Sequence, residues 1–374
     1  MKLNTYKEKL NEQWKRTGLE VKPATSVVSP LYPGNFCHCL DERDIYEKYG
    51  KFIDFGEEHY QKMQPAIRVN DFFSMGNVRG GHLGQFSIAT INGFNSVPAM
   101  DGRKQYEQSV RNMFSFIDSL GLDISKLRVS YFSGNDAKSI EASRKESEQK
   151  RKIRFDRYIP EDELKHVLIE QGLEEHQLIP NNTRDNFLTS VWYVTEAPWG
   201  FRNEILYQMP NRRLLDIGTI ERLPYNPIIE KEFFEDKKGY DHIATGLVDA
   251  NTHLIVDGVG FERIIQAVEG KDSIFDIESY KPYDELGHSP QIIEAAKIAH
   301  RVFTDSTFGG LGNRNTNRKT TIKKVMRCLD SLDNSSLEKL LLVNAQVYSD
   351  IYPELLGGVD KTIEEIEDYR KRRK

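Results

Sequence analysis

Leu254-Ile255-Val256-Asp257-Gly258-Val259-Gly260-Phe261-Glu262-Arg263-Ile264-Ile265 is the stretch of sequence that decides the fold. It predicts a buried apolar strand, a short turn with two glycines, and then a helix. The glycines let the backbone pass close to a flat or charged group. Arg263 opens the expected helix, where it can face an anion beside the N–H groups of the first turn. Asp257 ends the strand and is expected to point to the same place. An ordinary strand-to-helix turn is the alternative interpretation.

The run from Gly258 to Arg263 resembles motif 3 of the class II aminoacyl-tRNA synthetases, and the wider segment is most similar to the alanyl-tRNA synthetases. In that family the strand and helix lie under ATP, the arginine stacks on the adenine and faces the phosphates, and the aspartate holds the amino group of the amino acid. The resemblance therefore implies ATP-binding roles for Gly258, Gly260 and Arg263. It implies an amino-acid-binding role for Asp257.

A second segment predicts a β-hairpin, because apolar runs flank a Gly-rich loop between residues 66–71 and 79–88. The hairpin resembles motif 2 of the same family, with Arg68, His82 and Phe86 at the motif's positions. Arg68 would offer a planar fork to the α-phosphate and the new carbonyl oxygen. Phe86 would give the adenine an apolar face, and Arg79 and His82 would reach the outer phosphates. A surface hairpin with scattered basic residues is the alternative.

The N-terminal segment is less specific. Tyr6 to Arg16 predicts an amphipathic helix that ends at Gly18, and an extended run follows. This resembles the opening of the alanyl-type catalytic domain, with Pro30 or Pro33 as the proline of motif 1. An ordinary helix, loop and strand explains the pattern equally well.

Three further segments resemble the alanyl-type catalytic domain. Asp185-Asn186-Phe187-Leu188 matches a segment that ends in Trp in the family, so Leu188 replaces the aromatic residue that covers the alanine side chain. Residues 197–207 keep the family's glutamate as Glu204. The strand at 214–226 carries an acidic residue, Asp216, which the resemblance places near ATP-bound magnesium. We therefore expect Asp216, and Glu204 as a second ligand, to hold Mg²⁺ together with the phosphates.

The same strand carries Thr219 and Glu221. Residues two apart on a strand share a face, so both are expected in the implied amino-acid pocket. A carboxylate in an apolar pocket needs a cation or hydrogen-bond donors. Arg222 points to the other face, which leaves the substrate as a candidate partner of Glu221. The alternative is that Glu221 lies at the rim and is satisfied by water.

The remaining segments before residue 288 predict ordinary secondary structure. We expect a helix over Met100–Leu120, a strand over Leu127–Phe132 and a helix over Glu161–Leu178 that breaks at Gly172. Residues 134–154 are densely charged and predict either a solvated helix or an exposed insertion. Residues 230–250 are mostly polar and predict a connecting segment outside the core, before the motif 3 strand.

The C-terminal part predicts a second, helical domain over residues 288–374, after a catalytic domain over residues 1–287. Residues 291–330 contain eight Lys and Arg against three acidic residues. This basic segment indicates an RNA backbone contact through Arg318, Lys319, Lys323 and Arg327, with a solvated helix face as the alternative. It resembles the alanyl-type helical domain, which touches the tRNA acceptor stem.

Composition limits the compartment and the range of partners. The chain has 374 residues, a net charge of −5 and three cysteines, Cys37, Cys39 and Cys328, which fits a reducing cytoplasm. Cys37-His38-Cys39 favours a strand or loop over a zinc site, because no second cluster supplies further ligands. We expect no secretion signal and no membrane span, and therefore a cytoplasmic protein. The resemblance covers nearly the whole chain but not the family's editing domain, so we expect no proofreading in cis.

Together these features predict an α+β protein: a class II synthetase-type antiparallel sheet flanked by helices, followed by an α-helical module. The resemblance implies activation of an amino acid with ATP to an aminoacyl adenylate, with Arg68 and Arg263 offsetting charge on the phosphates. The expected acceptor is tRNA. A carrier protein or a small molecule of a biosynthetic pathway is the second hypothesis, and a silent paralogue that binds an amino acid or RNA is the third. The amino acid stays open, although Glu221 could favour a substrate with a second donor or cation.

Overall fold

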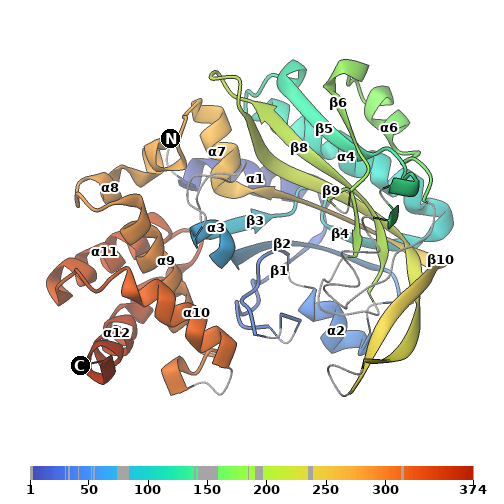
Figure 1. Cartoon of the computed structure of the whole chain (residues 1–374). Coiled ribbons are helices and arrows are strands. Elements are labelled where there is room, and N and C mark those ends of the chain that lie inside the picture. Colours follow the sequence, from blue (N-terminus) through green and yellow to red (C-terminus); the bar gives the residue numbers. More distant parts are fainter. Residues whose placement is uncertain are drawn as a thin grey trace.

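The computed structural model describes residues 3–373 apart from 30, 33, 41, 52, 54, 74–83, 139, 142–158, 184, 190–196, 235–238 and 313–315. Within this part, ten strands form one sheet, helices pack against it, and the C-terminal helices gather on one side (Figure 1). The strands are β1 (Glu20–Lys22), β2 (Glu58–Ile67), β3 (Gln85–Ala89), β4 (Phe94–Pro98), β5 (Leu127–Phe132), β6 (Leu178–Asn181), β7 (Phe187–Thr189), β8 (Trp199–Gln208), β9 (Leu214–Phe234) and β10 (Gly239–Gly260).

The strand order is β1-β2-β3-β10-β9-β8-β5-β6, with β4 beside β10 and β2, and β7 beside β8. The pairs β1–β2 and β5–β6 are parallel, and the other described pairs are antiparallel. The helices are α1 (Leu3–Thr17), α2 (Arg43–Tyr49), α3 (Val69–Phe73), α4 (Gly102–Ser119), α6 (Lys165–Glu170), α7 (Phe261–Glu269), α8 (Lys281–Asp284), α9 (Pro290–Thr304), α10 (Thr316–Arg327), α11 (Asn334–Val347) and α12 (Val359–Arg373). The α+β prediction, with a helical C-terminal part, is confirmed.

The deciding stretch differs from the prediction in one respect. β10 continues through both glycines to Gly260, and α7 begins at Phe261, so the expected turn between strand and helix is absent. Gly258 pairs with Thr219 of β9, and Gly260 pairs with Ile88 of β3. A side chain at position 260 would be crowded, because a Cβ there would lie 3.1 Å from Cδ of Arg263. The glycine therefore leaves room for the Arg263 side chain.

The described residues between 230 and 250 are not irregular. They belong to a long antiparallel pair in which β9 residues 218–234 face β10 residues 239–259, with register shifts between Ala244 and Gly246 and between Asp249 and Leu254. Ile228 and Val248 on this ribbon are 44% and 49% exposed, so burial does not impose a clear alternation of apolar and polar residues there. This explains why the sequence pattern failed to predict the strands.

Most of the other expected elements are present. α1, α4 and β5 lie at their predicted positions, and β2 and β3 pair antiparallel as the motif 2 hairpin requires. The helix expected over 161–178 is shorter, because α6 ends before Gly172, which has a φ of +102°. Pro30, Pro33 and most of the charged 134–154 segment lie outside the described residues.

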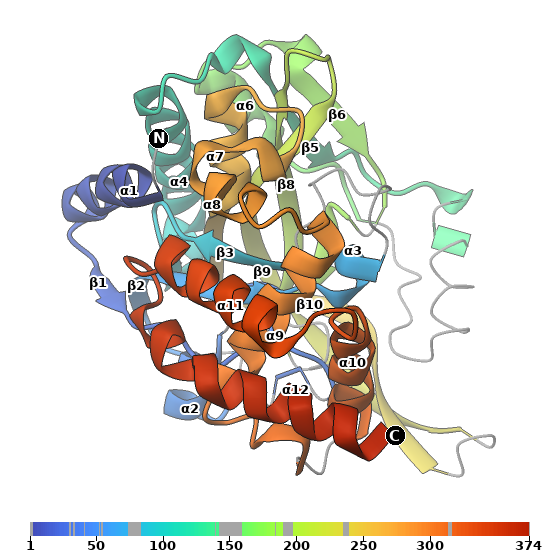
Figure 2. The same cartoon turned by 90° about the vertical axis from the view of Figure 1, so that its left-hand side faces the viewer.

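The C-terminal helices α9–α12 stack in front of the sheet in Figure 2. Ser289 caps α9, accepting a hydrogen bond from the Ile292 amide. Apolar side chains of these helices and of the sheet form one continuous cluster. The domain boundary near residue 288 stays a prediction. Over the described ranges, no helix combines the length and apolar character needed to cross a membrane.

Candidate active site and basic groove

Phe86 lies at the centre of the candidate site, with two arginines around its ring. Its side chain is 1% exposed on β3, where it pairs with Ala66 of β2. Cζ of Arg68 lies 5.0 Å from the ring centroid, and Cζ of Arg263 lies 5.1 Å from it. These distances are typical of cation–π contacts. The structure thus brings together predicted residues of the motif 2 and motif 3 segments, while Arg79 and His82 lie outside the described residues.

Arg263 is held by an acidic residue of the neighbouring strand. Its Nη1 donates to Oδ2 of Asp216 over 2.8 Å, and the two side chains are 4% and 25% exposed. Glu204, the second predicted magnesium ligand, lies on β8 directly across from Thr219 of β9. No group of three or more His, Cys, Asp and Glu in the described ranges has the geometry of a metal site. Mg²⁺ commonly takes one or two carboxylates with water and phosphate oxygens, so this pair of acids has suitable chemistry.

Residues 34–40, which we name the strap, connect the site to the N-terminal segment. The Cys37 carbonyl accepts the Ile67 amide over 2.7 Å, and the His38 carbonyl accepts Nε of Arg68 over 3.1 Å. Leu40 packs against the site face of the sheet next to Gly258. Its Cδ1 is so close that a Cβ added at Gly258 would lie 3.4 Å from it. The strap thus fixes Arg68 at the end of β2. It also confirms that Cys37-His38-Cys39 is a loop segment.

Burial shapes the chemistry of the strap. It lowers the pKa of His38 to about 4, with the charges of Arg68 and Arg202 acting in the same direction. Burial also raises the pKa of the Cys39 thiol to about 12, although a contact with the Tyr32 hydroxyl opposes this shift. The strap therefore presents a neutral imidazole and a neutral thiol at neutral pH.

Three of the predicted amino-acid-binding residues lie on one face of the sheet. Cross-strand partners project to the same side, and Thr219 pairs with Gly258 while Glu221 pairs with Val256. Leu188 is buried on β7, directly across from Gly200 of β8. Arg202 is two residues further along β8 and therefore faces the same side as Gly200. Since Arg202 lies across from Glu221, Leu188 shares the face of Thr219 and Glu221.

Glu221 has a protein partner that the sequence analysis missed. Nε of Arg202 donates to Oε1 of Glu221 over 2.8 Å, and the two side chains are 25% and 13% exposed. Arg202 lies directly across from Glu221 in the β8–β9 ladder. The neighbouring Arg222 instead pairs with Glu163. Knowledge of the strand register would have identified Arg202, but nothing in the local sequence gives that register.

Asp257 does not lie with these residues. Its carboxylate accepts the backbone N–H groups of Ile91, Asn92 and Gly93 over 2.8 to 3.3 Å, and the residue is 1% exposed. Burial raises its pKa to about 7, against the effect of these donors. Because β10 continues without a turn, Asp257 faces the side opposite to Gly258. The expected orientation of Asp257 toward the site is therefore corrected: its carboxylate fixes the turn between β3 and β4.

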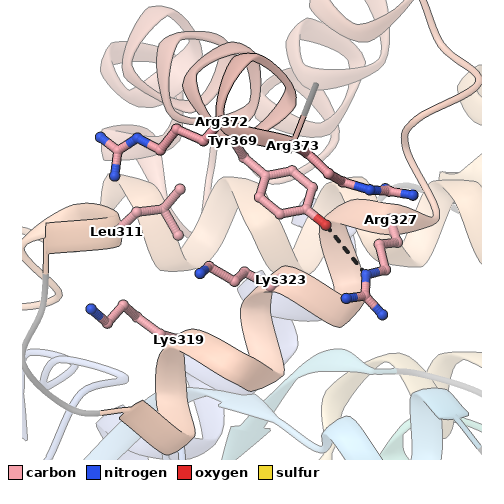
Figure 3. Close-up of a pocket in the computed structure, with 7 residues that line it drawn as sticks. All are labelled: Leu311, Lys319, Lys323, Arg327, Tyr369, Arg372 and Arg373. Atoms are coloured by element: carbon pink, nitrogen blue, oxygen red, sulfur yellow. Dashed lines mark hydrogen bonds between the residues drawn. The ribbon is translucent and has the colours of Figure 1, made fainter.

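A basic groove lies between α10 and α12 (Figure 3). It has a volume of about 310 Å³ and contains five cationic side chains, Lys319, Lys323, Arg327, Arg372 and Arg373, beside Leu311 and Tyr369. Nε of Arg327 donates to the Tyr369 hydroxyl over 3.3 Å. Three of the four predicted RNA-binding residues thus share one surface, and α12 contributes two cations that the sequence analysis did not select.

Arg318 is the exception among the predicted RNA-binding residues. It is 8% exposed, and its guanidinium donates to the carbonyls of Ser29, Tyr32 and Asn35 over 2.6 to 2.8 Å. On the α10 helix it lies on the buried side, next to Ile322, whereas Lys319 and Lys323 face outward. Its position favours a structural contact with the segment that leads into the strap.

A buried polar network connects the site to the C-terminal helices. Glu262, next to Arg263, accepts the Ser87 amide over 2.8 Å and the Tyr348 hydroxyl over 3.0 Å. Tyr348 contacts the Tyr280 hydroxyl, which accepts Nζ of Lys297 over 2.8 Å. Lys297 also pairs with Glu294, whose other oxygen accepts the amides of Gly84 and Gln85. The network therefore joins α9 and α11 to both ends of the segment that carries Phe86.

Comparisons with known proteins give sequence relatives but no family model that matches the chain. The alanine–tRNA ligase of Schizosaccharomyces pombe is 23% identical over 278 residues, which is 66% of this chain and 26% of that protein. The alanine–tRNA ligase of Mycoplasmopsis synoviae is 25% identical over 240 residues, 59% of this chain and 21% of that protein. The chain thus spans about a quarter of the length of the curated relatives it matches.

Two solved structures are similar at low sequence identity. The apo histidyl-tRNA synthetase of S. aureus has a TM-score of 0.37 and 13% identity, over 73% of this chain and 67% of that one. A structure described as the RNA binding domain of threonyl-tRNA synthetase from Cryptosporidium parvum has a TM-score of 0.40 and 12% identity, over 71% and 63%. On its sequence relatives and its helix-flanked, mainly antiparallel sheet, the chain is a class II aminoacyl-tRNA synthetase-like protein.

Proposed function

We propose that the chain is an ATP-dependent ligase that activates an amino acid to an aminoacyl adenylate and transfers it to tRNA. The observation that carries this proposal is the convergence of Arg68 and Arg263 on Phe86, on the sheet face that also holds Gly258. The sequence similarity to two alanine–tRNA ligases supports the same reaction class.

The groups around Phe86 fit a nucleotide. An aromatic face and two planar cations suit an adenine ring and its phosphates, and guanidinium groups bind phosphate oxygens in bidentate fashion. In this reaction the amino-acid carboxylate attacks the α-phosphorus, and pyrophosphate leaves with the electron pair of the broken bond. Arg68 and Arg263 would offset the charge that moves onto the phosphates, and they need no reorganisation to do so because the strap and Asp216 already hold them.

Mg²⁺ would be held by Asp216 and Glu204 together with phosphate oxygens, and it would add positive charge to the phosphates. Asp216 would then divide its two oxygens between the ion and Arg263. Both acids belong to adjacent strands, which fits the modest number of carboxylates that Mg²⁺ takes in nucleotide sites.

The proposal that tRNA is the acceptor rests on the positive charge of the basic groove. The basic groove of α10 and α12 presents a cluster of cations in a protein of net charge −5. Lys and Arg clusters of this kind bind nucleic-acid phosphates with a strong dependence on salt. The groove therefore supports tRNA as the acceptor over a small molecule.

ATP–pyrophosphate exchange, with each common amino acid and no RNA, tests the activation step. We expect exchange with one amino acid, and its loss in Arg263→Ala with folding checked by circular dichroism. Arg213→Ala, an exposed arginine of the β8–β9 connection, is the control and should keep full activity. Absence of exchange with every amino acid would contradict the proposal.

Binding of unfractionated tRNA at several salt concentrations tests the acceptor. Replacing Lys319, Lys323 and Arg372 together by alanine should weaken binding and reduce the slope of log K against log salt by about one unit for each lost phosphate contact. Lys324→Ala is the matched control, since Lys324 is exposed on α10 but does not line the groove. Exchange activity without tRNA binding would favour a carrier protein or small-molecule acceptor.

A further inference from the structure

We infer that Glu221, held in place by Arg202, is the carboxylate that binds the α-ammonium group of the amino-acid substrate; the inference rests on the proposed function. An α-amino acid carries its ammonium group one carbon away from the carboxylate that reacts. Groups that bind the two ends must therefore lie close together, on the same face of the sheet. An ammonium group removed from water needs an anionic partner.

Few carboxylates of the described chain are available on the site face. Asp216 is occupied by Arg263. Asp257 faces the opposite side, where three backbone N–H groups surround it. Two other strand carboxylates are left to consider: Glu221 on β9, directly beside β10, and Glu204 on β8, one strand further away.

The contacts favour Glu221 over Glu204. Glu221 pairs across the ladder with Val256, two residues from Gly258 on the same face. The charges of Glu42, Glu221 and Arg68 all act on the Cys39 thiol, so Glu221 and Arg68 both lie near this strap residue. Glu42 precedes α2 and belongs to no strand of the sheet. Glu221 is thus the strand carboxylate near Arg68, which we assign to the reacting end of the substrate.

The Glu221 side chain is also prepared for a second partner. Oε1 accepts Nε of Arg202, whereas Oε2 accepts no hydrogen bond from any described residue. The side chain keeps 13% of its surface exposed. Arg202 therefore fixes the carboxylate by one oxygen and leaves the other for an ammonium donor, an arrangement that needs no rearrangement on binding.

This assignment narrows the range of amino acids that can be substrates. If Glu221 binds the α-ammonium group, it does not select a cationic side chain. The other two residues that are predicted to bind the amino acid on this face, Leu188 and Thr219, carry no charge. We therefore expect an α-amino acid with a free amino group and an uncharged side chain. Carboxylic acids that lack the amino group should be poor substrates.

The test is steady-state ATP–pyrophosphate exchange with the amino acid that the wild-type protein selects. Glu221→Gln should raise the KM for that amino acid by about 10–100-fold, the range expected for losing a hydrogen bond to a charged group, and leave the KM for ATP unchanged. Glu221→Asp, which keeps the charge on a shorter side chain, should recover part of the affinity. Glu163→Gln removes an exposed carboxylate that pairs with Arg222 and is the control.

The wild-type protein supplies a second readout. The des-amino analogue of the selected amino acid should compete much more weakly than the amino acid itself. An unchanged amino-acid KM in Glu221→Gln, or an equal rise in both KM values, would overturn this inference and leave the proposed activation chemistry intact. Failure of the wild-type protein to exchange with any amino acid would instead overturn both.

Discussion

Asp257 is a buried carboxyl group that the sequence assigned to substrate and the structure assigns to a turn. Its two oxygens accept the N–H groups of Ile91, Asn92 and Gly93. These three residues lie between β3 and β4, so one carboxyl group satisfies three backbone donors that are outside the strands. Asn92 in turn donates to the Ser109 hydroxyl of α4. Asp257 thus fixes the connection between β3, which carries Phe86, and β4.

Asp257→Asn should therefore lower stability first and activity only as a consequence. The amide replaces one accepting oxygen by an NH₂ group that faces the backbone donors. We expect the free energy of unfolding to fall by about 2–4 kcal/mol, measured by urea denaturation at pH 7. Asp249→Asn, an exposed carboxylate of the same strand, should change it little. Equal losses in the two variants would contradict the structural role.

His300 is a buried histidine with a defined tautomer. Nε2 donates to the Leu355 carbonyl over 2.7 Å, and Nδ1 accepts from the Asn344 amide over 2.9 Å. Burial lowers its pKa from 6.5 to about 4. Because the folded value lies below the ordinary one, the contribution of His300 to stability is fully present above pH 6.5 and is lost as the pH falls toward 4.

Nitrogen chemical shifts of ¹⁵N-labelled histidine should show this directly. The His300 ring should keep the pattern of a neutral imidazole protonated at Nε2 down to about pH 5, well below the usual range for histidine. His300→Gln identifies the signal by its disappearance. A titration midpoint near 6.5 would show that the ring is exposed or differently bonded.

At the scale of elements, the sequence correctly predicted the helices and the hairpin that a local pattern of residues determines. Helical patterns in the sequence located α1 and α4, and the motif 2 hairpin appears as paired β2 and β3. The predictions fail where the structure depends on pairing between strands that are far apart in the sequence. The β9–β10 ribbon and the Arg202 partner of Glu221 depend on strand register. The side of Asp257 depends on whether β10 turns or continues, and one residue of difference reverses the face.

The α9 helix contributes a buried ion pair, Lys297 with Glu294, both with no exposed surface. Lys297→Met leaves the Glu294 carboxylate without its cation, and we expect a loss of about 3–5 kcal/mol in the free energy of unfolding. Adding Glu294→Gln should recover part of the loss, because the amide oxygen can still accept from the Gly84 amide. Lys281→Ala breaks an exposed pair with Glu278 and should cost at most about 1 kcal/mol. Similar losses for Lys297→Met and Lys281→Ala would contradict a buried pair.

At the scale of the whole molecule, the helical part and the sheet share one core and several charged contacts. Arg318 of α10 donates to the carbonyls of Tyr32, before the strap, and of Asn35, at its start. Glu294 of α9 accepts the amides of the two residues before Phe86. Separating the two parts would leave these charged groups without partners. The surface that bears the basic groove is therefore mechanically connected to the candidate site, although the two lie on different elements.

We accordingly predict that the chain unfolds in one cooperative transition rather than in two. All three tryptophans, Trp14, Trp192 and Trp199, precede residue 288. Trp199 lies on β8 and Trp14 bonds the Thr90 carbonyl at the end of β3, so tryptophan fluorescence reports on the sheet-bearing part. Hydrogen exchange of the α11 and α12 amides reports on the helices. In urea the two probes should give the same midpoint, because neither part satisfies its buried polar groups alone. Arg318→Met, which removes three hydrogen bonds to the sheet-bearing part, should lower both midpoints together. Two separate transitions, or an effect of Arg318→Met on the helices alone, would mean that the parts fold independently and that the shared core is not what couples them.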